Sequence, residues 1–543
     1  MKRIAIVGAG CSGLAAIKSS LDEGFEPVCF EREDDIGGLW RYSHTPKVGS
    51  GGVYKTCVIN TSKEMMSFSD FPPPQEFPMF MPHKFVLKYL RMYAESFGLI
   101  KYINFKTSVE NIIPASDYSL SGQWRVRYIS GGGESKTEVF DGVLVCIGHH
   151  TYPHIPEFEG LETFTGKYIH SHSYKENVEF TGKRVLVVGI GNSAVDITVD
   201  LSHVTAQTYI STRRGAWVIS RMGFFGLPAD AIANCRFLFK LPTSLLQWCV
   251  EKMANFRFDH EGYGLRPMHR ALQAHPTIND ELPYRIMTGA VKIRPDIHHI
   301  MKDKVYFTDG TFLEIDAIIF ATGFDYKLSF VPESVTRIQN NRTELYKYMF
   351  PPHLNHPTFA VIGLVQSIGS VMPISEMQCR WFMKIMKAEC ELPSEEVMLE
   401  DIQAKQETMA KTYVKSQRHT LQCFWVDYMD ELANQIGVKP DLWKLFCEDP
   451  ALVIRCIFGP CVPAQYRLMG PGSWNGARAT IKGSVQRCLF PTRTKLLPKN
   501  ATGKENNSLY SINIQHHLHS YFVILFVVFI FFCTSFVGDH FGL

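Results

Sequence analysis

The chain begins with a pattern that a strand, a tight turn and a helix satisfy together. An apolar run, Ile4 to Val7, leads into Gly8-Ala9-Gly10-Cys11-Ser12-Gly13, and apolar residues then recur at helical spacing. In such a unit the first glycine permits the turn, the second lets backbone amides approach a pyrophosphate, and the third lets the helix lie close to the strand. The pattern therefore predicts an α/β fold with a parallel sheet at the start of the chain.

A second apolar run, Pro27 to Phe30, ends on Glu31, which lies 23 residues after Gly8. An acidic side chain at this place accepts hydrogen bonds from the ribose hydroxyls of a dinucleotide. The N-terminus of the intervening helix adds partial positive charge and N–H groups for the phosphates. We therefore predict a dinucleotide site here. The alternative is a glycine-rich turn that binds no ligand.

The same arrangement returns in the middle of the chain. A strand from Arg184 to Val188 enters Gly189-Ile190-Gly191-Asn192-Ser193-Ala194, and a helix from Asn192 to Leu201 leaves it. Ala194 replaces the third glycine, which the pattern permits. The next strand, Gln207 to Ser211, is followed by Arg213 and Arg214 instead of an acid.

The two sites therefore differ in the ribose that they favour. An acid would repel a 2′-phosphate, whereas an arginine binds it with a bidentate fork. The first site thus fits a cofactor with free ribose hydroxyls, such as FAD, and the second fits NADPH. The alternative for Arg213 and Arg214 is a solvated strand edge without a ligand.

Two further strands are similar to each other. Asp141 to Gly148 and Asp316 to Gly323 are apolar runs in which the aspartate lies seven residues before the final glycine. This echo predicts two related Rossmann-like dinucleotide-binding domains. We expect the FAD-binding domain in residues 1–150 and 326–445, and the NADP-binding domain in 151–325 with a helical insertion at about 224–294. A C-terminal extension and linker (446–519) and a membrane anchor (520–538) follow.

The composition excludes some classes of protein. A net charge of +3 indicates no acidic partner, so nucleic acid is disfavoured as a ligand. The 14 cysteines are scattered, with no CxxC pair and no zinc-like Cys/His spacing. We therefore expect no metal site, and free thiols in a reducing compartment.

The predicted anchor contains no charged residue between Ser520 and Gly538. As a helix, Tyr521 to Val537 would span roughly 25 Å, which is close to the thinner membrane of the endoplasmic reticulum. Lysines precede the segment and an aspartate follows it, which favours a catalytic body on the cytosolic side. A buried terminal helix and a segment that lies on the membrane surface are the alternatives.

Two histidine-containing motifs lie outside the glycine-rich loops. Phe164, Gly166, His170 and Tyr174 form the pattern FxGxxxHxxxY, in which His170 is as well explained by a structural role as by a functional one. The run Arg257-Phe258-Asp259-His260-Glu261 matches no metal-site spacing, and we interpret it as structural.

Taken together, these stretches resemble the flavin-containing monooxygenases over nearly the whole chain. The family's FAD and NADP fingerprints are matched by the two glycine-rich loops, and FxGxxxHxxxY is similar to a marker shared with Baeyer–Villiger enzymes. Phe320-Ala321-Thr322-Gly323-Phe324 is similar to the family's FATGY, and the hydrophobic C-terminus looks like the anchor of the vertebrate microsomal forms. Thr212 to Trp217 and Arg257 to Glu261 look closest to form five, which is linked to Baeyer–Villiger oxidation of ketones more than to amine oxidation.

The resemblance implies a set of cofactor contacts. Those to FAD would be Gly8, Ala9, Gly10, Cys11, Ser12, Gly13, Glu31, Leu39, Trp40, Asn60 and Thr61. Those to NADP would be Ile59, Asn60, Gly189, Gly191, Ser193, Ala194, Val195 and Asp196, with Arg213 and Arg214 at the 2′-phosphate. The chain departs from the family at His172-Ser173, where Arg-Asp is common, and at Ala194-Val195. Both departures are expected to alter the affinity for NADP.

The resemblance also implies a reaction. NADPH would reduce FAD, O₂ would give a C4a-hydroperoxyflavin, and one oxygen would pass to an amine, a sulfide or a ketone, with Asn60 as the catalytic hydrogen-bonding residue. The alternatives are an NADPH oxidase that releases hydrogen peroxide, a flavin-dependent disulfide reductase, and a membrane-tethered binding protein without activity. The sequence leaves assembly into homo-oligomers open.

Overall fold

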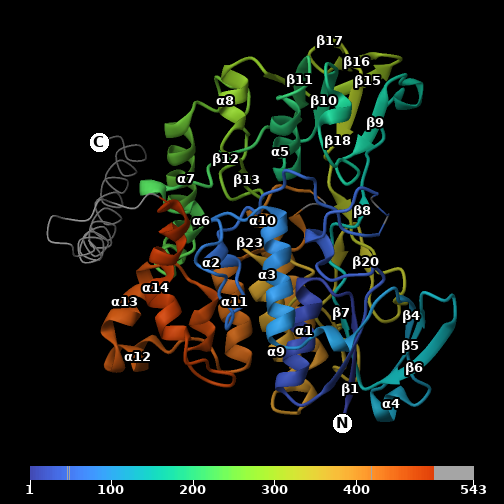
Figure 1. Ribbon diagram of the computed structural model, residues 1–543, viewed down its shortest axis with the longest axis vertical. Coiled ribbons are helices and arrows are strands. Elements are labelled where there is room, and N and C mark those ends of the chain that lie inside the picture. The colour runs from blue at the N-terminus through green and yellow to red at the C-terminus, as the bar shows by residue number, and fades with distance from the viewer. Residues whose placement is uncertain (46, 48, 417–418, 495–543) are drawn as a thin grey trace.

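The computed structural model describes residues 1–45, 47, 49–416 and 419–494. Two lobes lie one above the other in Figure 1, each built on a five-stranded parallel sheet. Both sheets bury strands that are apolar on both faces, as parallel sheets covered by helices require. The structure therefore confirms the predicted α/β class.

The first sheet, in the lower lobe, has the order β22-β7-β1-β2-β3 and is parallel throughout. Its strands are β1 (Arg3–Val7), β2 (Glu26–Phe30), β3 (Ile103–Asn104), β7 (Gly142–Val145) and β22 (Phe359–Val361). Helix α1 (Cys11–Asp22) joins β1 to β2 and lies against the almost wholly buried α9 (Val371–Met386), where the Ser12 and Ser375 hydroxyls are 2.9 Å apart. The chain beyond residue 325 thus returns to the first sheet.

The second sheet, in the upper lobe, has the order β14-β11-β10-β18-β9 and is also parallel. Its strands are β9 (Lys167–His170), β10 (Arg184–Val188), β11 (Gln207–Ser211), β14 (Val291–Arg294) and β18 (Ala317–Phe320), and α5 (Asn192–Leu201) joins β10 to β11. The sequence analysis placed residues 291–294 in the helical insertion and predicted no strand there, so β14 (Val291–Arg294) was missed. It belongs to the sheet instead, because the alternation Val-Lys-Ile-Arg suits an edge strand with one buried face.

The similarity between the runs that begin at Asp141 and at Asp316 has a structural basis. In each lobe a three-stranded antiparallel sheet precedes the last central strand: β4 (Ser108–Pro114), β5 (Trp124–Ile129) and β6 (Ser135–Phe140) before β7, and β15 (Ile297–Met301), β16 (Lys304–Phe307) and β17 (Phe312–Glu314) before β18. Asp141 accepts a hydrogen bond from the Arg3 N–H, and Asp316 accepts one from the Arg184 N–H, both at 2.7 Å. Each aspartate thus fixes the start of the glycine-loop strand beside it.

Other elements belong to the insertion or adjoin the lower lobe (Figure 1). In the structure the insertion extends from the end of β11 to the start of β14, and so begins earlier than predicted. It contains β12 (Val218–Ile219), α6 (Ala229–Ala233), α7 (Thr243–Arg257), β13 (Thr277–Ile278) and α8 (Leu282–Met287). Helices α2 (Lys63–Met66), α3 (His83–Ser96), α10 (Glu395–Thr412), α11 (Trp425–Gln435), α12 (Leu442–Glu448), α13 (Pro450–Phe458) and α14 (Ala477–Leu489), with the strand pair β23 (Gln366–Ile368) and β24 (Gln422–Phe424), adjoin the lower lobe. An ion pair of 2.6 Å between Arg236 and Asp430 joins the insertion to α11.

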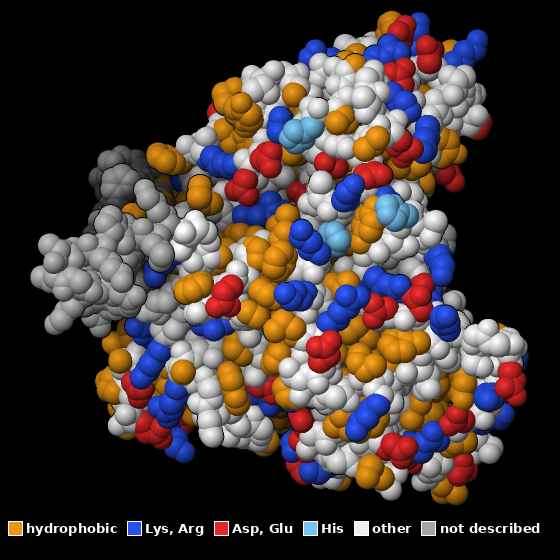
Figure 2. Space-filling view, viewed as in Figure 1, with side chains coloured by type: hydrophobic (Ala, Val, Ile, Leu, Met, Phe, Trp, Pro, Cys, Tyr) orange, Lys and Arg blue, Asp and Glu red, His pale blue; other side chains and the backbone are white. Residues whose placement is uncertain are grey.

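Figure 2 shows that hydrophobic side chains gather across the middle of one face, whereas basic and acidic side chains are interspersed over both lobes. Among the helices that the structure describes, none combines the length and the apolar character needed to cross a bilayer. The predicted anchor, residues 520–538, lies outside the described residues.

Candidate functional site

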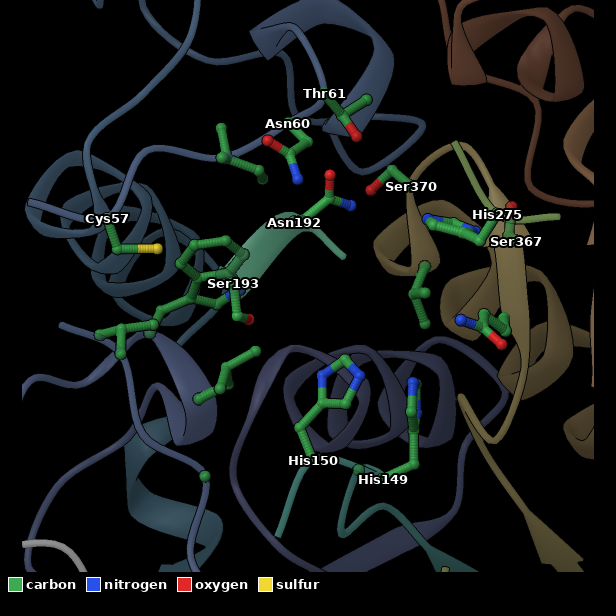
Figure 3. Close-up of a pocket in the computed structure, with 18 of the residues that line it drawn as sticks. Cys57, Asn60, Thr61, His149, His150, Asn192, Ser193, His275, Ser367 and Ser370 are labelled. Atoms are coloured by element: carbon green, nitrogen blue, oxygen red, sulfur yellow. The ribbon is translucent and has the colours of Figure 1, made fainter. Parts of the chain in front are cut away.

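A cavity of about 2330 Å³ lies between the lobes, at the carboxyl ends of strands from both sheets (Figure 3). Most of the predicted cofactor residues line it: Gly8, Gly10, Cys11, Ser12, Glu31, Leu39, Trp40, Ile59, Asn60, Thr61, Gly191, Ser193, Ala194 and Asp196. Ala9, Gly13, Gly189, Val195, Arg213 and Arg214 are not part of its lining. The tertiary structure thus brings the two glycine-rich loops to one cavity.

Three positions of the first loop, Gly8, Gly10 and Gly13, require glycine for different structural reasons. Gly8 has φ +98°, and a Cβ on Gly13 would lie 1.9 Å from the Gly8 carbonyl oxygen, so helix α1 can approach β1 only without that carbon. A Cβ on Gly10 would meet only the Gly38 Cα, at 3.7 Å, and Gly10 faces the cavity. Gly13 therefore serves the packing of the loop, and Gly10 leaves its backbone open to a ligand.

Both glycine loops end at a helix N-terminus that no side chain caps. Gly10 precedes α1 and Gly191 precedes α5, and neither position provides a side-chain hydrogen bond to the first turn. The N–H groups of a first turn lack partners within the helix, and an anionic group satisfies them well. These two helix starts therefore fit the pyrophosphates of two dinucleotides.

Glu31 is buried and lines the cavity. Its Oε2 accepts a hydrogen bond of 2.7 Å from the Ala9 N–H, and its Oε1 accepts one of 2.9 Å from the Glu33 N–H. A carboxylate oxygen has a further lone pair. Glu31 therefore holds the glycine loop in shape and keeps the capacity to accept from ribose hydroxyls.

The second loop is held by the insertion, which the sequence did not predict. The side-chain oxygen of Asn192 accepts a hydrogen bond of 2.7 Å from the Ile278 N–H, and the Thr277 hydroxyl donates to the Ile190 carbonyl at the same distance. Strand β13 therefore fixes the start of α5. Ser193 is drawn among the cavity residues in Figure 3, between Asn192 and Cys57.

Arg213 and Arg214 follow β11 and are exposed. The Gly189 N–H donates to the Ser211 carbonyl at 3.0 Å, so the arginine pair comes next to the second glycine loop. Neither guanidinium forms an ion pair with the described part of the chain. Their role at a 2′-phosphate stays a prediction.

Asn60 lies at the top of the cavity in Figure 3, with its side-chain nitrogen toward the interior. Its Oδ1 accepts a hydrogen bond of 2.7 Å from the Arg221 guanidinium, which belongs to the segment just after β12. Arg221 also lies 3.7 Å from Asp196 and 3.4 Å from Asp280. No local motif indicates Arg221, because its partner Asn60 is 161 residues away in the sequence.

Asp196 lies in α5 and joins this helix to the segment of Tyr54 and to the insertion. Its carboxylate accepts hydrogen bonds from the Tyr54 hydroxyl, at 2.8 Å, and from the Asn279 side-chain amide, at 2.9 Å. Burial raises the pKa of Asp196, whereas the Arg221 charge and these hydrogen bonds lower it. The neighbouring Cys57 thiol has its pKa raised to about 12 by burial, so it stays protonated.

Two histidines that the sequence did not indicate face the cavity. His149 and His150 follow β7, their rings are 4.2 Å apart, and both point into the space below Asn192 and Ser193 in Figure 3. Burial lowers the pKa of His149 to about 4. The His149 side chain is therefore uncharged near neutral pH.

The histidine of FxGxxxHxxxY has a structural environment. His170 is buried, does not line the cavity, and its Nδ1 accepts a hydrogen bond of 3.1 Å from the His172 N–H. Burial lowers its pKa to about 4. His172 does line the cavity, where its Nε2 donates to the Ser50 carbonyl at 2.7 Å. His170 thus supports the fold and His172 the cavity wall.

The run Arg257 to Glu261 also has a structural role. His260 is buried, its Nε2 accepts from the Val218 N–H at 3.1 Å, and its Nδ1 lies 2.9 Å from the Asn255 side-chain oxygen. Within the described residues no group of three histidine, cysteine or acidic side chains could hold a metal ion. The described cysteines are free thiols, and none is in a disulfide.

Comparison with known proteins gives the family. The model of flavin-binding monooxygenase-like proteins matches residues 1–533. Flavin-containing monooxygenase 5 of Rattus norvegicus is 50% identical over 509 residues, which cover 92% of this chain and 95% of the relative. The Homo sapiens protein of that name is 47% identical over 508 residues, covering 92% and 95%.

Solved structures share the fold at lower identity. S-allyl-L-cysteine S-oxygenase from Allium sativum has a TM-score of 0.63 and 24% identity, covering 90% of this chain and 99% of that one. Cyclohexanone monooxygenase from Rhodococcus sp. Phi1, bound to NADP⁺, has a TM-score of 0.57 and 17% identity, covering 80% and 97%.

The match over nearly the whole chain confirms the resemblance inferred from the two glycine loops, and with it the predicted class of enzyme and its cofactors. The chain belongs to the flavin-binding monooxygenase-like family, and it is an oxidoreductase that uses FAD and NADPH to insert oxygen into small molecules.

Proposed function

We propose that FAD lies against the start of α1, that NADPH lies against the start of α5, and that both meet in the one cavity beside Asn60. The observation that carries this proposal is that two uncapped helix N-termini, from two lobes, open into the same space. When bound, the reduced flavin supplies the oxygen chemistry, and the protein positions and shields the reactants. We also propose the domain limits predicted from the sequence, with FAD bound by residues 1–150 and 326–445 and NADPH bound by residues 151–325.

On the FAD side, Gly10 and the first turn of α1 would receive the pyrophosphate, and Glu31 the ribose. Leu39 and Trp40, on the single turn Gly38–Trp40, line the cavity next to Gly10 and would cover the cofactor. On the NADPH side, Gly191 and Ser193 would receive the pyrophosphate, with Arg213 and Arg214 at the rim for the 2′-phosphate. Val195 is buried in the core, so only its backbone could contribute.

Asn60 would act as a hydrogen-bond donor to the reacting centre. Its oxygen is already bonded to Arg221, which leaves the side-chain N–H groups for the cavity. A preorganised donor of this kind stabilises charge that develops in a transition state without reorganisation. The buried Ile59 and the half-buried Thr61 line the same wall and restrict water there.

The substrates would be small uncharged compounds. The insertion contributes apolar side chains to the cavity, including Leu238, Phe239, Leu246 and Val250. The names of relatives include an N-oxide-forming monooxygenase, an S-oxygenase and a ketone monooxygenase. We place ketones first, as substrates of Baeyer–Villiger oxidation, because of the similarity to flavin-containing monooxygenase 5.

The test is incubation of the full chain with NADPH, O₂ and three probes: a linear ketone, a thioether and a tertiary amine. We expect an ester from the ketone at a higher kcat/KM than sulfoxide or N-oxide formation. Formation of sulfoxide or N-oxide without ester would reject the ketone preference. Quantitative release of hydrogen peroxide with all three probes would instead favour the NADPH oxidase alternative.

We also propose attachment to the endoplasmic reticulum membrane through residues 520–538, with the catalytic body in the cytosol. The support is the uncharged apolar run in the sequence. We expect the expressed protein to sediment with microsomes and to stay in the pellet after extraction with alkaline carbonate. Deletion of residues 520–538 should abolish this sedimentation. A deleted protein that still sediments after carbonate would reject it.

A further inference from the structure

The segment from Arg221 to Asp230 forms a closed loop at the start of the insertion. The Ala229 N–H donates to the Arg221 carbonyl at 2.8 Å, and the Gly223 N–H donates to the Leu227 carbonyl at 2.7 Å. Phe225, near the tip, has φ +57°, which a non-glycine residue keeps only where its surroundings impose it. The two ends of the loop, Arg221 and Asp230, are therefore held close together.

Both ends of this loop contact the segment that carries Asn60. Arg221 donates to the side-chain oxygen of Asn60 at 2.7 Å. Asp230 accepts from Ser62 twice with the same oxygen, from the N–H at 2.7 Å and from the hydroxyl at 3.0 Å. The segment Asn60–Ser62 is thus held at both of its ends by one loop of the insertion.

The contact between Asp230 and Ser62 is unusual in two respects. Ser62 is buried and precedes α2, yet its hydroxyl bonds to Asp230 and does not cap the helix. The second oxygen of Asp230 is buried and has no hydrogen-bond partner among the described residues, although burying an unpaired polar atom costs free energy. Burial raises the pKa of Asp230 to about 6, against the lowering effect of the Ser62 hydrogen bonds.

We propose that Asp230 is a positioning residue, which holds Asn60 in place at the cavity through its two hydrogen bonds to Ser62. This proposal rests on the role of Asn60 proposed above. Although Asp230 lines the cavity, the role proposed for it is indirect and runs through Ser62. The substitution Asp230→Asn should therefore still hold Asn60 in place, because the amide oxygen of asparagine can accept both Ser62 hydrogens.

The test compares Asp230→Ala, Asp230→Asn and the control Asp259→Ala in the full chain. Asp259 is an exposed aspartate of the insertion that accepts from the Glu261 and Gly262 N–H groups, away from Asn60. We expect Asp230→Ala to bind FAD but to release about tenfold more hydrogen peroxide per NADPH consumed. Asp230→Asn and Asp259→Ala should stay close to the wild type. Wild-type coupling in Asp230→Ala, or equal uncoupling in Asp230→Asn, would overturn the proposal.

A second measurement does not depend on turnover. Hydrogen–deuterium exchange in the peptide that contains Ser62 should be about fivefold faster in Asp230→Ala, since one amide hydrogen bond is lost, and unchanged in Asp230→Asn. Should Asp230→Ala lose its flavin, Ser62→Ala removes only the hydroxyl donor and should raise peroxide release about threefold. Unchanged peroxide release in Ser62→Ala together with unchanged exchange in Asp230→Ala would reject the proposal.

The double variant Asn60→Ala with Asp230→Ala separates the two proposals. If Asp230 acts through Asn60, the double variant should release no more peroxide than Asn60→Ala alone. If Asn60→Ala itself remains coupled, the proposed role of Asn60 fails. If Asn60→Ala is uncoupled and the two substitutions add, Asp230 has an effect of its own and the positioning role fails.

Discussion

The guanidinium of Arg221 donates a hydrogen bond of 2.7 Å to the side-chain oxygen of Asn60. Arginine has donors and no acceptor, so this contact fixes which end of the Asn60 amide faces Arg221. The nitrogen therefore faces the cavity, as Figure 3 shows. An asparagine side chain offers both a donor and an acceptor, and the contact with Arg221 leaves the donor for the reacting centre.

Asn60→Asp and Asn60→Ala should both lose oxygenation while keeping FAD. Aspartate would pair with Arg221 but would present an acceptor to the cavity where asparagine presents a donor, and alanine would present neither. We expect kcat for product formation to fall about a hundredfold in each, with NADPH consumption diverted to hydrogen peroxide. Product and peroxide are measured together against NADPH consumed. Retained product formation in Asn60→Asp would mean that the donor is not needed.

Arg213→Ala combined with Arg214→Ala should raise the KM for NADPH at least tenfold and leave that for NADH within about twofold, because only NADPH carries the 2′-phosphate. Steady-state kinetics with both nucleotides give the comparison. Arg127→Ala, an exposed arginine on β5 in the other lobe, is the matched control. An equal rise for the two nucleotides would show that the pair does not recognise the phosphate.

Gly13→Ala should prevent FAD binding. Its Cβ would lie 1.9 Å from the Gly8 carbonyl, so α1 must move away from the loop, at a cost of about 1–3 kcal/mol in the free energy of unfolding. Flavin content per chain, measured by absorbance after denaturation, is the readout. Gly132→Ala, whose Cβ would meet nothing within 4 Å, should retain full flavin. A flavin-replete Gly13→Ala protein would contradict the tight packing of the loop.

His260 should make stability depend on pH. Burial lowers its pKa from the ordinary 6.5 to about 4, and its Nε2 must be unprotonated to accept from Val218. Between these values the unfolded chain binds the proton and the folded chain does not. The stabilisation is therefore complete above pH 6.5 and is lost, on the order of 2 kcal/mol, as the pH falls toward 4.

The measurement is urea unfolding of the wild type, His260→Gln and the exposed-site control His298→Gln between pH 4 and 7.5. The free energy of unfolding of His260→Gln should decline less over this range than that of the wild type. The control should follow the wild type. Parallel curves for all three proteins would mean that His260 does not titrate as described.

Local patterns predicted much of the framework. The helix from Asn192 to Leu201 and the strand from Gln207 to Ser211 have the predicted limits, because Gly191 and the apolar runs mark them within a few residues. Strand β14 was missed, since four residues of alternating polarity are too short to distinguish an edge strand from a loop.

The sequence by itself determined two glycine-rich strand–helix units, the acid at Glu31, the arginines after β11 and, through them, the family and its cofactors. These features are local, because backbone conformation and side-chain spacing within about thirty residues decide them. Only the tertiary structure decided that both units open into one cavity, that Arg221 orients Asn60, and that Asp230 and β13 hold the neighbouring segments. These contacts join residues that are 86 to 168 positions apart, and each depends on how the insertion packs between the lobes, which no short pattern records.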